Sequence, residues 1–242
     1  MKTRMTKDSW VMTTPVAHRG LVDENTFENT YPAYEKAIEK GYPIEMDVQM
    51  TKDGVAVCLH DNNVKRLTGV DAHINDLTFE ESNKLCICGS NEHMPLFKDF
   101  LKFVDGRVPL MIEIKMQKRD RYNIAKVVVD ALKDYKGEFV VQSFDPRIMG
   151  RVRKYNPDII RGQLGGAEKG DKISFPQYII VRYLIANFIS KPDYVNYKIE
   201  AMPKKIKLPH VFWTVKNEEQ KKEAENYGCN YVFENVRPEI KK

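Results

Sequence analysis

Apolar, strand-like runs alternate with helix-like segments along most of the chain, and this alternation limits the fold more than any other feature. Most of the runs are rich in β-branched and aromatic residues, as strands are; they span residues 15–18, 44–50, 55–60, 108–114, 139–144, 159–164, 194–197, 211–215 and 231–233. Helical patterns lie between them, at residues 31–40, 96–103, 122–135, 147–155, 175–188 and 218–227. This alternation predicts an α/β protein with a parallel sheet.

The number of strands favours closure of that sheet. About eight strands, with one extra paired run at residues 55–60, suit a (β/α)8 TIM barrel, and the 242 residues suit a single barrel domain over 1–242. Residues 61–95 are too many for an ordinary barrel loop, so we expect a small insertion after the second strand region, with a short helix at 79–85. A doubly wound open sheet is the alternative, but no glycine-rich phosphate loop follows the first strand.

Charge narrows the range of partners. Lysine and arginine number 39 against 34 acidic residues, a net charge of +5. This surplus favours anionic partners such as phosphorylated small molecules or an acidic membrane surface. The basic residues are scattered and no nucleic-acid-reading motif occurs, so nucleic acid is not an expected partner. The sequence carries no signal for the oligomeric state.

The compartment is inferred from absent signals. The four cysteines have neither zinc-site spacing nor a disulfide framework, residues 1–12 do not resemble a secretory signal, and no run of about 18 apolar residues occurs. We therefore expect a cytoplasmic protein. The longest apolar segment, within the predicted helix at 175–188, is expected to be a barrel helix packed on the sheet. Its alternative is a peripheral contact with lipid.

Three carboxylates interrupt otherwise apolar strands. Glu45 and Asp47 are two residues apart in the run at 44–50, so a strand points both to one side. Glu113 interrupts the run at 108–114 in the same way. Burial of unpaired carboxylates is costly. A divalent cation would compensate them, and hard oxygen ligands suit Mg²⁺ or Ca²⁺; ion pairs with lysine or arginine are the alternative.

Basic side chains and histidines also fall at strand ends. Lys115 shares the side of Glu113 and could hold a phosphate, pair with Glu113, or do both. His18 and His60 each end a run and are each followed by a charged residue. In α/β barrels the carboxyl ends of the strands form the active face. Histidine titrates near neutral pH, so the two are candidates for a general acid and a general base.

An ordered set of short segments resembles the glycerophosphodiester phosphodiesterase family. No single segment is specific, but their order is: they are His18-Arg19-Gly20, Glu28-Asn29-Thr30, Glu45-Met46-Asp47-Val48, Lys52-Asp53-Gly54, His60-Asp61, Glu113-Ile114-Lys115, Ser143-Phe144 and Trp213-Thr214-Val215. The resemblance implies a barrel hydrolase that converts glycerophosphodiesters into glycerol 3-phosphate and an alcohol.

The resemblance also assigns roles to residues. It implies that one divalent cation, Mg²⁺ or Ca²⁺, is held by Glu45, Asp47 and Glu113, and that His18 and His60 are the acid/base pair. The positions that contact phosphate or substrate match Arg19, Lys115, Glu28 and Trp213. Core packing for Trp213 and a helix-capping role for Glu28 are the alternatives. By likeness to phosphatidylinositol-specific phospholipases C, His18 would be the base and His60 the acid, although the two could be exchanged.

Several alternatives stay open at the level of sequence. The family ends its last strand with threonine-aspartate before a proline, whereas this chain has Glu234-Asn235 before Pro238. Attack by the glycerol 2-hydroxyl through a cyclic phosphate and direct attack by water both suit the same residues. A lysophospholipase D or another phosphodiesterase could use this site, and a barrel that binds phosphorylated ligands without turnover is a third hypothesis.

Overall fold

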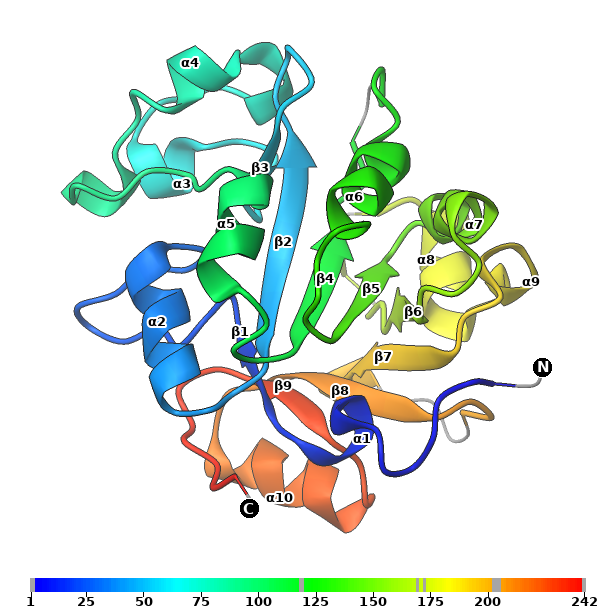
Figure 1. Cartoon of the computed structure of the whole chain (residues 1–242). Helices are drawn as coiled ribbons and strands as arrows, with labels where there is room; N and C mark the ends of the chain where they lie inside the picture. Colours follow the sequence, from blue (N-terminus) through cyan, green and yellow to red (C-terminus); the bar gives the residue numbers. More distant parts are fainter. Residues whose placement is uncertain (1–2, 118–119, 169, 172, 202–205, 241–242) are drawn as a thin grey trace.

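The strands form one sheet that closes on itself (Figure 1). The computed structural model describes residues 3–117, 120–168, 170–171, 173–201 and 206–240. Closure follows because β1 pairs in parallel with both β2 and β9. The parallel strands of the barrel are β1 (Val16–His18), β2 (Ile44–Met50), β4 (Leu110–Ile114), β5 (Phe139–Ser143), β6 (Arg161–Gly165), β7 (Tyr194–Lys198), β8 (His210–Val215) and β9 (Tyr231–Phe233). The predicted (β/α)8 barrel is confirmed, and the open-sheet alternative is excluded.

The extra paired run is β3 (Ala56–Cys58), which lies outside the barrel and pairs antiparallel with β2. The hairpin turns the chain back along β2, so that the backbone N–H of Leu59 donates to the carbonyl of Asp47 at 3.1 Å. β3 is thus the second strand of a β-hairpin, and its direction brings His60, just beyond its end, close to Asp47 in β2. The expected extra paired run at 55–60 is therefore present, and the structure adds that it is antiparallel to β2.

The predicted insertion follows β3 and has its own small core. It carries α3 (Lys65–Thr68), η1 (Ile74–Asp76), α4 (Phe79–Ser82) and η2 (Ile87–Gly89), and Figure 1 shows it projecting to one side of the barrel. Its buried side chains pack with Val57 of β3 and with Leu59; they are Val64, Leu67, Ile74, Ile87 and Met94. The predicted helix at 79–85 is shorter than expected. Its start is fixed by a reciprocal capping box between Thr78 and Glu81.

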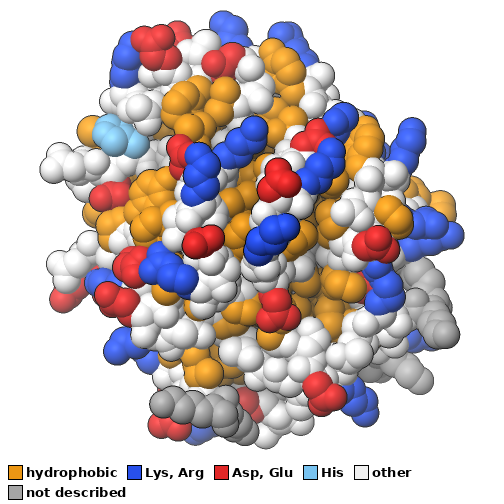
Figure 2. Space-filling view, viewed as in Figure 1, with side chains coloured by type: hydrophobic (Ala, Val, Ile, Leu, Met, Phe, Trp, Pro, Cys, Tyr) orange, Lys and Arg blue, Asp and Glu red, His pale blue; other side chains and the backbone are white. Residues whose placement is uncertain are grey.

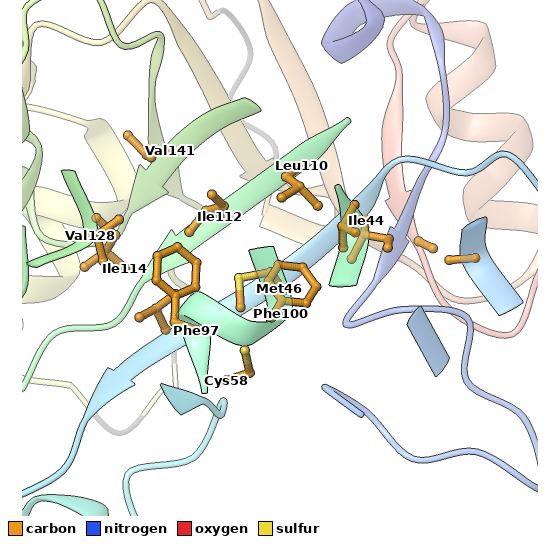
Figure 3. Close-up of a cluster of buried hydrophobic side chains, with 14 of the residues drawn as sticks. Ile44, Met46, Cys58, Phe97, Phe100, Leu110, Ile112, Ile114, Val128 and Val141 are labelled. Atoms are coloured by element: carbon orange, nitrogen blue, oxygen red, sulfur yellow. The ribbon is translucent and has the colours of Figure 1, made fainter. Parts of the chain in front are cut away.

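Helices cover the outside of the barrel. They are α2 (Tyr31–Glu39), α5 (Phe97–Val104), α6 (Ile124–Leu132), α7 (Pro146–Tyr155) and α10 (Glu218–Asn226), with a single turn, η3 (Ile199–Ala201), after β7. Figure 3 shows the layer between this shell and the strands, where Met46 of β2 lies near Phe97 and Phe100 of α5. The outward residues of β2 and β4 are thus apolar. The inward residues are free to be polar because successive strand side chains alternate in direction.

The interior of the barrel is apolar at its amino-terminal end. Met111, Val140 and Val211 meet there, and α1 (Trp10–Thr13) closes that end with Val11. The polar inward side chains, which include Glu45, lie one layer further along the strands. Closure of one end leaves the carboxyl-terminal end as the open mouth, as in other α/β barrels.

The segment predicted as one helix at 175–188 is two helices. α8 (Phe175–Tyr183) ends where Leu184 takes a left-handed conformation with φ 53°, and α9 (Asn187–Ser190) follows. No residue of α8 is buried. The expectation of a helix packed on the sheet therefore holds only in part for α8, because its residues 178–182 are half-buried and Val181 accepts a hydrogen bond from Gly166 after β6 at 3.3 Å, whereas its first residues are exposed. α9 packs on α7 through Ile189 and Gly150.

The structure also bears on the expectations that the chain has no membrane-spanning segment and no disulfide framework. Within them, no helix is both long enough and apolar enough to cross a membrane. All four cysteines are free thiols, and Cys58 is buried. On the face drawn in Figure 2, acidic and basic side chains are interspersed among hydrophobic ones instead of forming one continuous basic patch.

An ion-pair cluster ties the amino-terminal segment to the barrel. The carboxylate of Asp193, 5% exposed, accepts hydrogen bonds from Arg4 Nε at 2.9 Å, Arg4 Nη2 at 2.8 Å and the backbone N–H of Arg161 at 3.0 Å. Burial by itself would raise the pKa of Asp193, but these hydrogen bonds lower it. The ionised carboxylate therefore stabilises the folded state, most of all above the pKa of the unfolded chain.

We expect Asp193→Asn to lower the free energy of unfolding by roughly 3 kcal/mol at neutral pH, because it leaves the Arg161 guanidinium buried without its counter-charge. The difference from the unsubstituted protein should narrow as the pH falls below about 4, where the unfolded carboxyl becomes protonated. Denaturant unfolding at several pH values measures this. Asp99→Asn, which removes the exposed partner of Lys102, is the control and should change stability by less than about 1 kcal/mol. Equal losses in the two variants would contradict the assignment.

Candidate active site

Strand register brings the three predicted carboxylates together. His18 pairs with Glu45 between β1 and β2, and Asp47 pairs with Glu113 between β2 and β4. All four point into the barrel near its open mouth. One oxygen each from Glu45, Asp47 and Glu113 lies within 4.8 Å of the others, and all three residues are buried.

These carboxylates fit a divalent cation. Burial and the neighbouring charges of Asp47 and Glu113 raise the pKa of Glu45 well above its ordinary value even though Arg19 and Lys115 lower it, so the nearby cations do not fully compensate the three carboxylates. Asp47 Oδ1 is buried and makes no hydrogen bond, although Lys115 Nζ lies 3.1 Å away as an ionic contact outside hydrogen-bond geometry. An oxygen without a hydrogen bond, within a set of hard oxygen donors, is what Mg²⁺ or Ca²⁺ would bind.

Two cations line the carboxylate cluster. Lys115 Nζ donates to Glu113 Oε1 at 2.7 Å, and Arg19 Nε lies 3.3 Å from Asp47 Oδ2. Burial opposes the charge of Lys115, but Asp47 and Glu113 outweigh it and raise the pKa of Lys115. For Asp47 the balance is reciprocal: burial would raise its pKa, yet Lys115 and the other surrounding positive groups lower it. These carboxylates therefore form ion pairs with Arg19 and Lys115, which was the alternative to a metal site, and they are also grouped closely enough to bind a divalent cation.

In the turn after β1, two successive residues with positive φ position the side chain of Arg19. Arg19 has φ 57° and Gly20 has φ 89°. A Cβ atom on Gly20 would lie 2.8 Å from the backbone of Ala33 at the start of α2, so only glycine fits there. The guanidinium of Arg19 then donates to Glu28 Oε1 at 2.8 Å. Glu28 thus orients Arg19, which is a more specific role than a helix cap.

His18 is held by the residue that departs from the family pattern. Its Nδ1 lies 2.5 Å from Glu234 Oε1, and this hydrogen bond lowers the pKa of Glu234 to about 2. Because the ionised carboxylate can only accept, Nδ1 carries the proton and Nε2 faces the site, 3.8 Å from Glu45 Oε2. Burial and the charge of Arg19 lower the pKa of His18, while Glu234 opposes them.

His60 has the same kind of support from another carboxylate. Its Nδ1 lies 2.6 Å from Asp61 Oδ1, and Asp61 Oδ2 accepts from Arg66 Nε at 2.6 Å. Arg66 also donates to both oxygens of Glu28. A continuous run of charged groups therefore joins His60 to Arg19 across the mouth of the barrel. The imidazole of His60 is 33% exposed against 13% for His18, so His60 lies nearer to solvent.

A pocket of about 370 Å³ opens over these groups. Trp213 of β8 lines it and meets the ring of Phe144 edge to face at 5.5 Å between centroids. The Trp213 indole N–H is 3.2 Å from the carbonyls of both Gly165 and Asn196. Trp213 is therefore fixed as a wall of the pocket. The volume suits a small ligand.

Several polar residues in or beside this pocket were given no role from the sequence. Arg66 lies in the insertion, where no strand pattern points to the site. Gln142 and Asn196 are inward residues of β5 and β7, and Asn196 Nδ2 donates to Gln142 Oε1 at 3.0 Å. An asparagine within an apolar strand was the available signal for Asn196. Asn29 lies in the Glu28-Asn29-Thr30 segment, but no role was assigned to it from the sequence. Its side-chain amide donates to Asp47 Oδ2 at 3.0 Å.

One pocket thus offers cationic groups for an anion, a place for a divalent ion and two oriented histidines. Cleavage of a phosphate ester needs charge neutralisation on the phosphoryl oxygens and proton transfer to and from the reacting oxygens. The fold and this pocket together are those of the barrel phosphodiesterase class.

Comparison with known proteins supports that class. The sequence model of the glycerophosphoryl diester phosphodiesterase family matches residues 18–236. The chain belongs to this family, whose name denotes hydrolases of phosphoric diesters. The match begins at His18 and includes Glu234, so it spans every residue of the candidate site.

Individual relatives share part of their length with the chain. A glycerophosphodiester phosphodiesterase of Caldanaerobacter subterraneus is 33% identical over 62% of this chain and 65% of that protein. A lysophospholipase D of Mus musculus, GDPD1, is 31% identical over 60% of this chain and 49% of that protein. The chain therefore matches less than two thirds of either relative.

Among solved structures, a phosphodiesterase of Oleispira antarctica in complex with the product sn-glycerol-3-phosphate superposes with a TM-score of 0.78. The two chains are 19% identical, and the match covers 92% of this chain and 93% of that one. At this identity the likeness shows a shared fold.

Proposed function

We propose that this protein hydrolyses glycerophosphodiesters to glycerol 3-phosphate and an alcohol. The observation that carries the proposal is the convergence of three buried carboxylates, two cationic side chains and two carboxylate-paired histidines at the mouth of one barrel. Membership of the glycerophosphoryl diester phosphodiesterase family supports it. So does the name of the Caldanaerobacter relative.

Glu45, Asp47 and Glu113 would hold the divalent cation, Mg²⁺ or Ca²⁺. When bound, such an ion supplies positive charge to a phosphoryl oxygen and lowers the pKa of a hydroxyl or water beside it. Arg19 and Lys115 border the same carboxylates. They would hold the phosphate and neutralise charge that develops on its oxygens.

The histidines would move the protons. His18 presents an unprotonated Nε2 to the interior because Glu234 holds the proton on Nδ1, and this form accepts a proton from the attacking hydroxyl or water. His60 lies nearer to solvent, with its Nδ1 hydrogen-bonded to Asp61, and would donate to the leaving alcohol. Glu28 would position Arg19 through its hydrogen bond. Trp213 would position the bound substrate as part of the pocket wall.

The test is release of glycerol 3-phosphate from soluble glycerophosphodiesters, before and after EDTA treatment and with Mg²⁺ or Ca²⁺ restored. We expect release to stop with EDTA and to return with one of the two ions, because the carboxylates alone leave the site without the charge that the phosphate needs. Full activity after exhaustive removal of metal would contradict the cation site.

A lysophospholipase D activity is the second candidate. The exposed apolar surface of α8, beside the end of β6, favours it because a lipid chain could lie there. The mouse relative carries that name. Hydrolysis of a lysophospholipid in preference to glycerophosphocholine would select this function over the first.

The hypothesis of a barrel without turnover depended on Glu234-Asn235. The contact between Glu234, directly after β9, and Nδ1 of His18 supports the catalytic interpretation of this position instead. The single domain over 1–242 and the cytoplasmic location stay predictions.

A further inference from the structure

α8 is a helix that the barrel covers only in part. It has nine residues; residues 178–182 are half-buried, and none is fully buried. Isolated helices shorter than about 12–15 residues are marginal in water, and most helices in proteins depend on a packed apolar face. α8 is nevertheless apolar on several sides, which indicates a surface made to be covered.

The side chains that would be covered are large and continue into α9. Phe175 is 75% exposed, Tyr183 60% and Phe188 72%. Ile185 is exposed as well, at 55%. Aromatic and aliphatic side chains gathered on one short helical segment are typical of segments that lie in the interface of a membrane.

The charges around this surface are mostly positive. Residues 173–192 contain Arg182 and Lys191 but no acidic residue, and α7 contains arginine and lysine but no acidic residue. Asp145, directly before α7, pairs with Arg147 at 2.7 Å and offsets only that charge of the helix. α9 packs on Gly150 of α7. Arg147 and Lys154 lie three residues before and four residues after Gly150, which places them on the same face of α7, and both are exposed.

The position of this surface relates it to the pocket. The backbone N–H of Gly166, directly after β6, donates to the carbonyl of Val181 in α8 at 3.3 Å, and Leu184 packs on Gly165. Gly165 also accepts from Trp213, which lines the pocket. Figure 1 shows α7, α8 and α9 together on one side of the barrel, away from the insertion.

We propose that α8 and α9, with the basic face of α7, form a docking surface for an anionic lipid membrane. Phe175, Tyr183 and Phe188 would enter the interface, and Arg147, Lys154 and Lys191 would contact the lipid phosphates. Lipid is favoured over a second copy of the chain because two copies of this face would bring like charges together. The docking does not depend on the reaction at the site.

The experiment measures sedimentation of the purified protein with phosphatidylcholine vesicles and with vesicles that also contain phosphatidylglycerol. We expect binding to the anionic vesicles that weakens as salt is added, because basic residues supply part of the attraction. The double variant Phe175→Ser/Phe188→Ser should bind at least about tenfold more weakly. Lys154→Glu should reduce the salt-sensitive part of the binding.

Two control variants change the same kinds of residue elsewhere. Tyr227→Ser alters an exposed aromatic at the end of α10, and Lys102→Glu alters an exposed lysine of α5; both should bind vesicles normally. Circular dichroism melting checks that every variant is folded. Absence of binding by the folded, unsubstituted protein, or equal loss in the control variants, would overturn the proposal. So would a dimer that Phe175→Ser/Phe188→Ser dissociates, because a second copy would then be the occupant.

Discussion

Replacement of His60 by alanine is expected to lower the turnover of a glycerophosphodiester by about 10²–10⁴-fold, as loss of a general acid or base does. The reason lies in its setting: Asp61 holds His60 Nδ1 at 2.6 Å and so fixes the imidazole at the open mouth. KM should change much less than kcat, since the proton transfer belongs to the transition state. Steady-state kinetics with the preferred cation saturating measures both.

His73→Ala is the matched control for this prediction. His73 is exposed in the insertion and lies outside the carboxylate cluster. It should keep normal turnover. Near-normal turnover in His60→Ala would remove His60 from the mechanism. A substrate with a more acidic leaving alcohol should suffer a smaller loss in His60→Ala if His60 is the acid, because such an alcohol needs less protonation.

Asp47→Asn is expected to raise the cation concentration needed for activity by at least about 100-fold. Loss of groups that merely orient metal ligands costs about 10–100-fold in metal affinity, and a ligand should cost at least as much. The substitution keeps the shape of the side chain, which Asn29 contacts at 3.0 Å, and removes its charge. Activity titrated with metal measures the effect in the enzyme.

A second readout separates metal binding from catalysis. Cation binding should raise the melting temperature of the unsubstituted protein, because a ligand that binds only the folded state stabilises it. That rise should be small in Asp47→Asn and normal in Asp130→Asn, which alters an exposed carboxylate of α6. An unchanged metal titration together with an unchanged thermal shift would show that Asp47 is not a ligand.

The candidate residues were found from sequence because strands alternate their side chains. The two-residue spacing of Glu45 and Asp47 fixes them on one side of β2 whatever the partner strand, so their proximity follows from sequence alone. The residues that lie beside them on neighbouring strands cannot be predicted from this spacing. Only the register places Asp47 beside Glu113 and His18 beside Glu45.

Two features could not be predicted from the sequence for one physical reason. A strand-like run does not reveal its direction, so the extra paired run at 55–60 was predicted without its antiparallel orientation. The sequence of an apolar helix does not reveal how much of it is covered, and within the described residues α8 is covered only in part. Both properties depend on contacts between segments far apart in the chain.

The sequence by itself determined the alternation of strands and helices, the apolar outer faces of the barrel strands and the identity of the charged residues that interrupt them. Periodicity and residue type are local, and local rules are enough to predict them. The tertiary structure alone decided which groups meet. It placed Glu234 against His18 across 216 positions of chain, and it linked His60 to Arg19 through Asp61, Arg66 and Glu28. The first contact arises because closure of the barrel brings its last strand against its first, and the second because Arg66 of the insertion reaches Glu28 of the loop after β1.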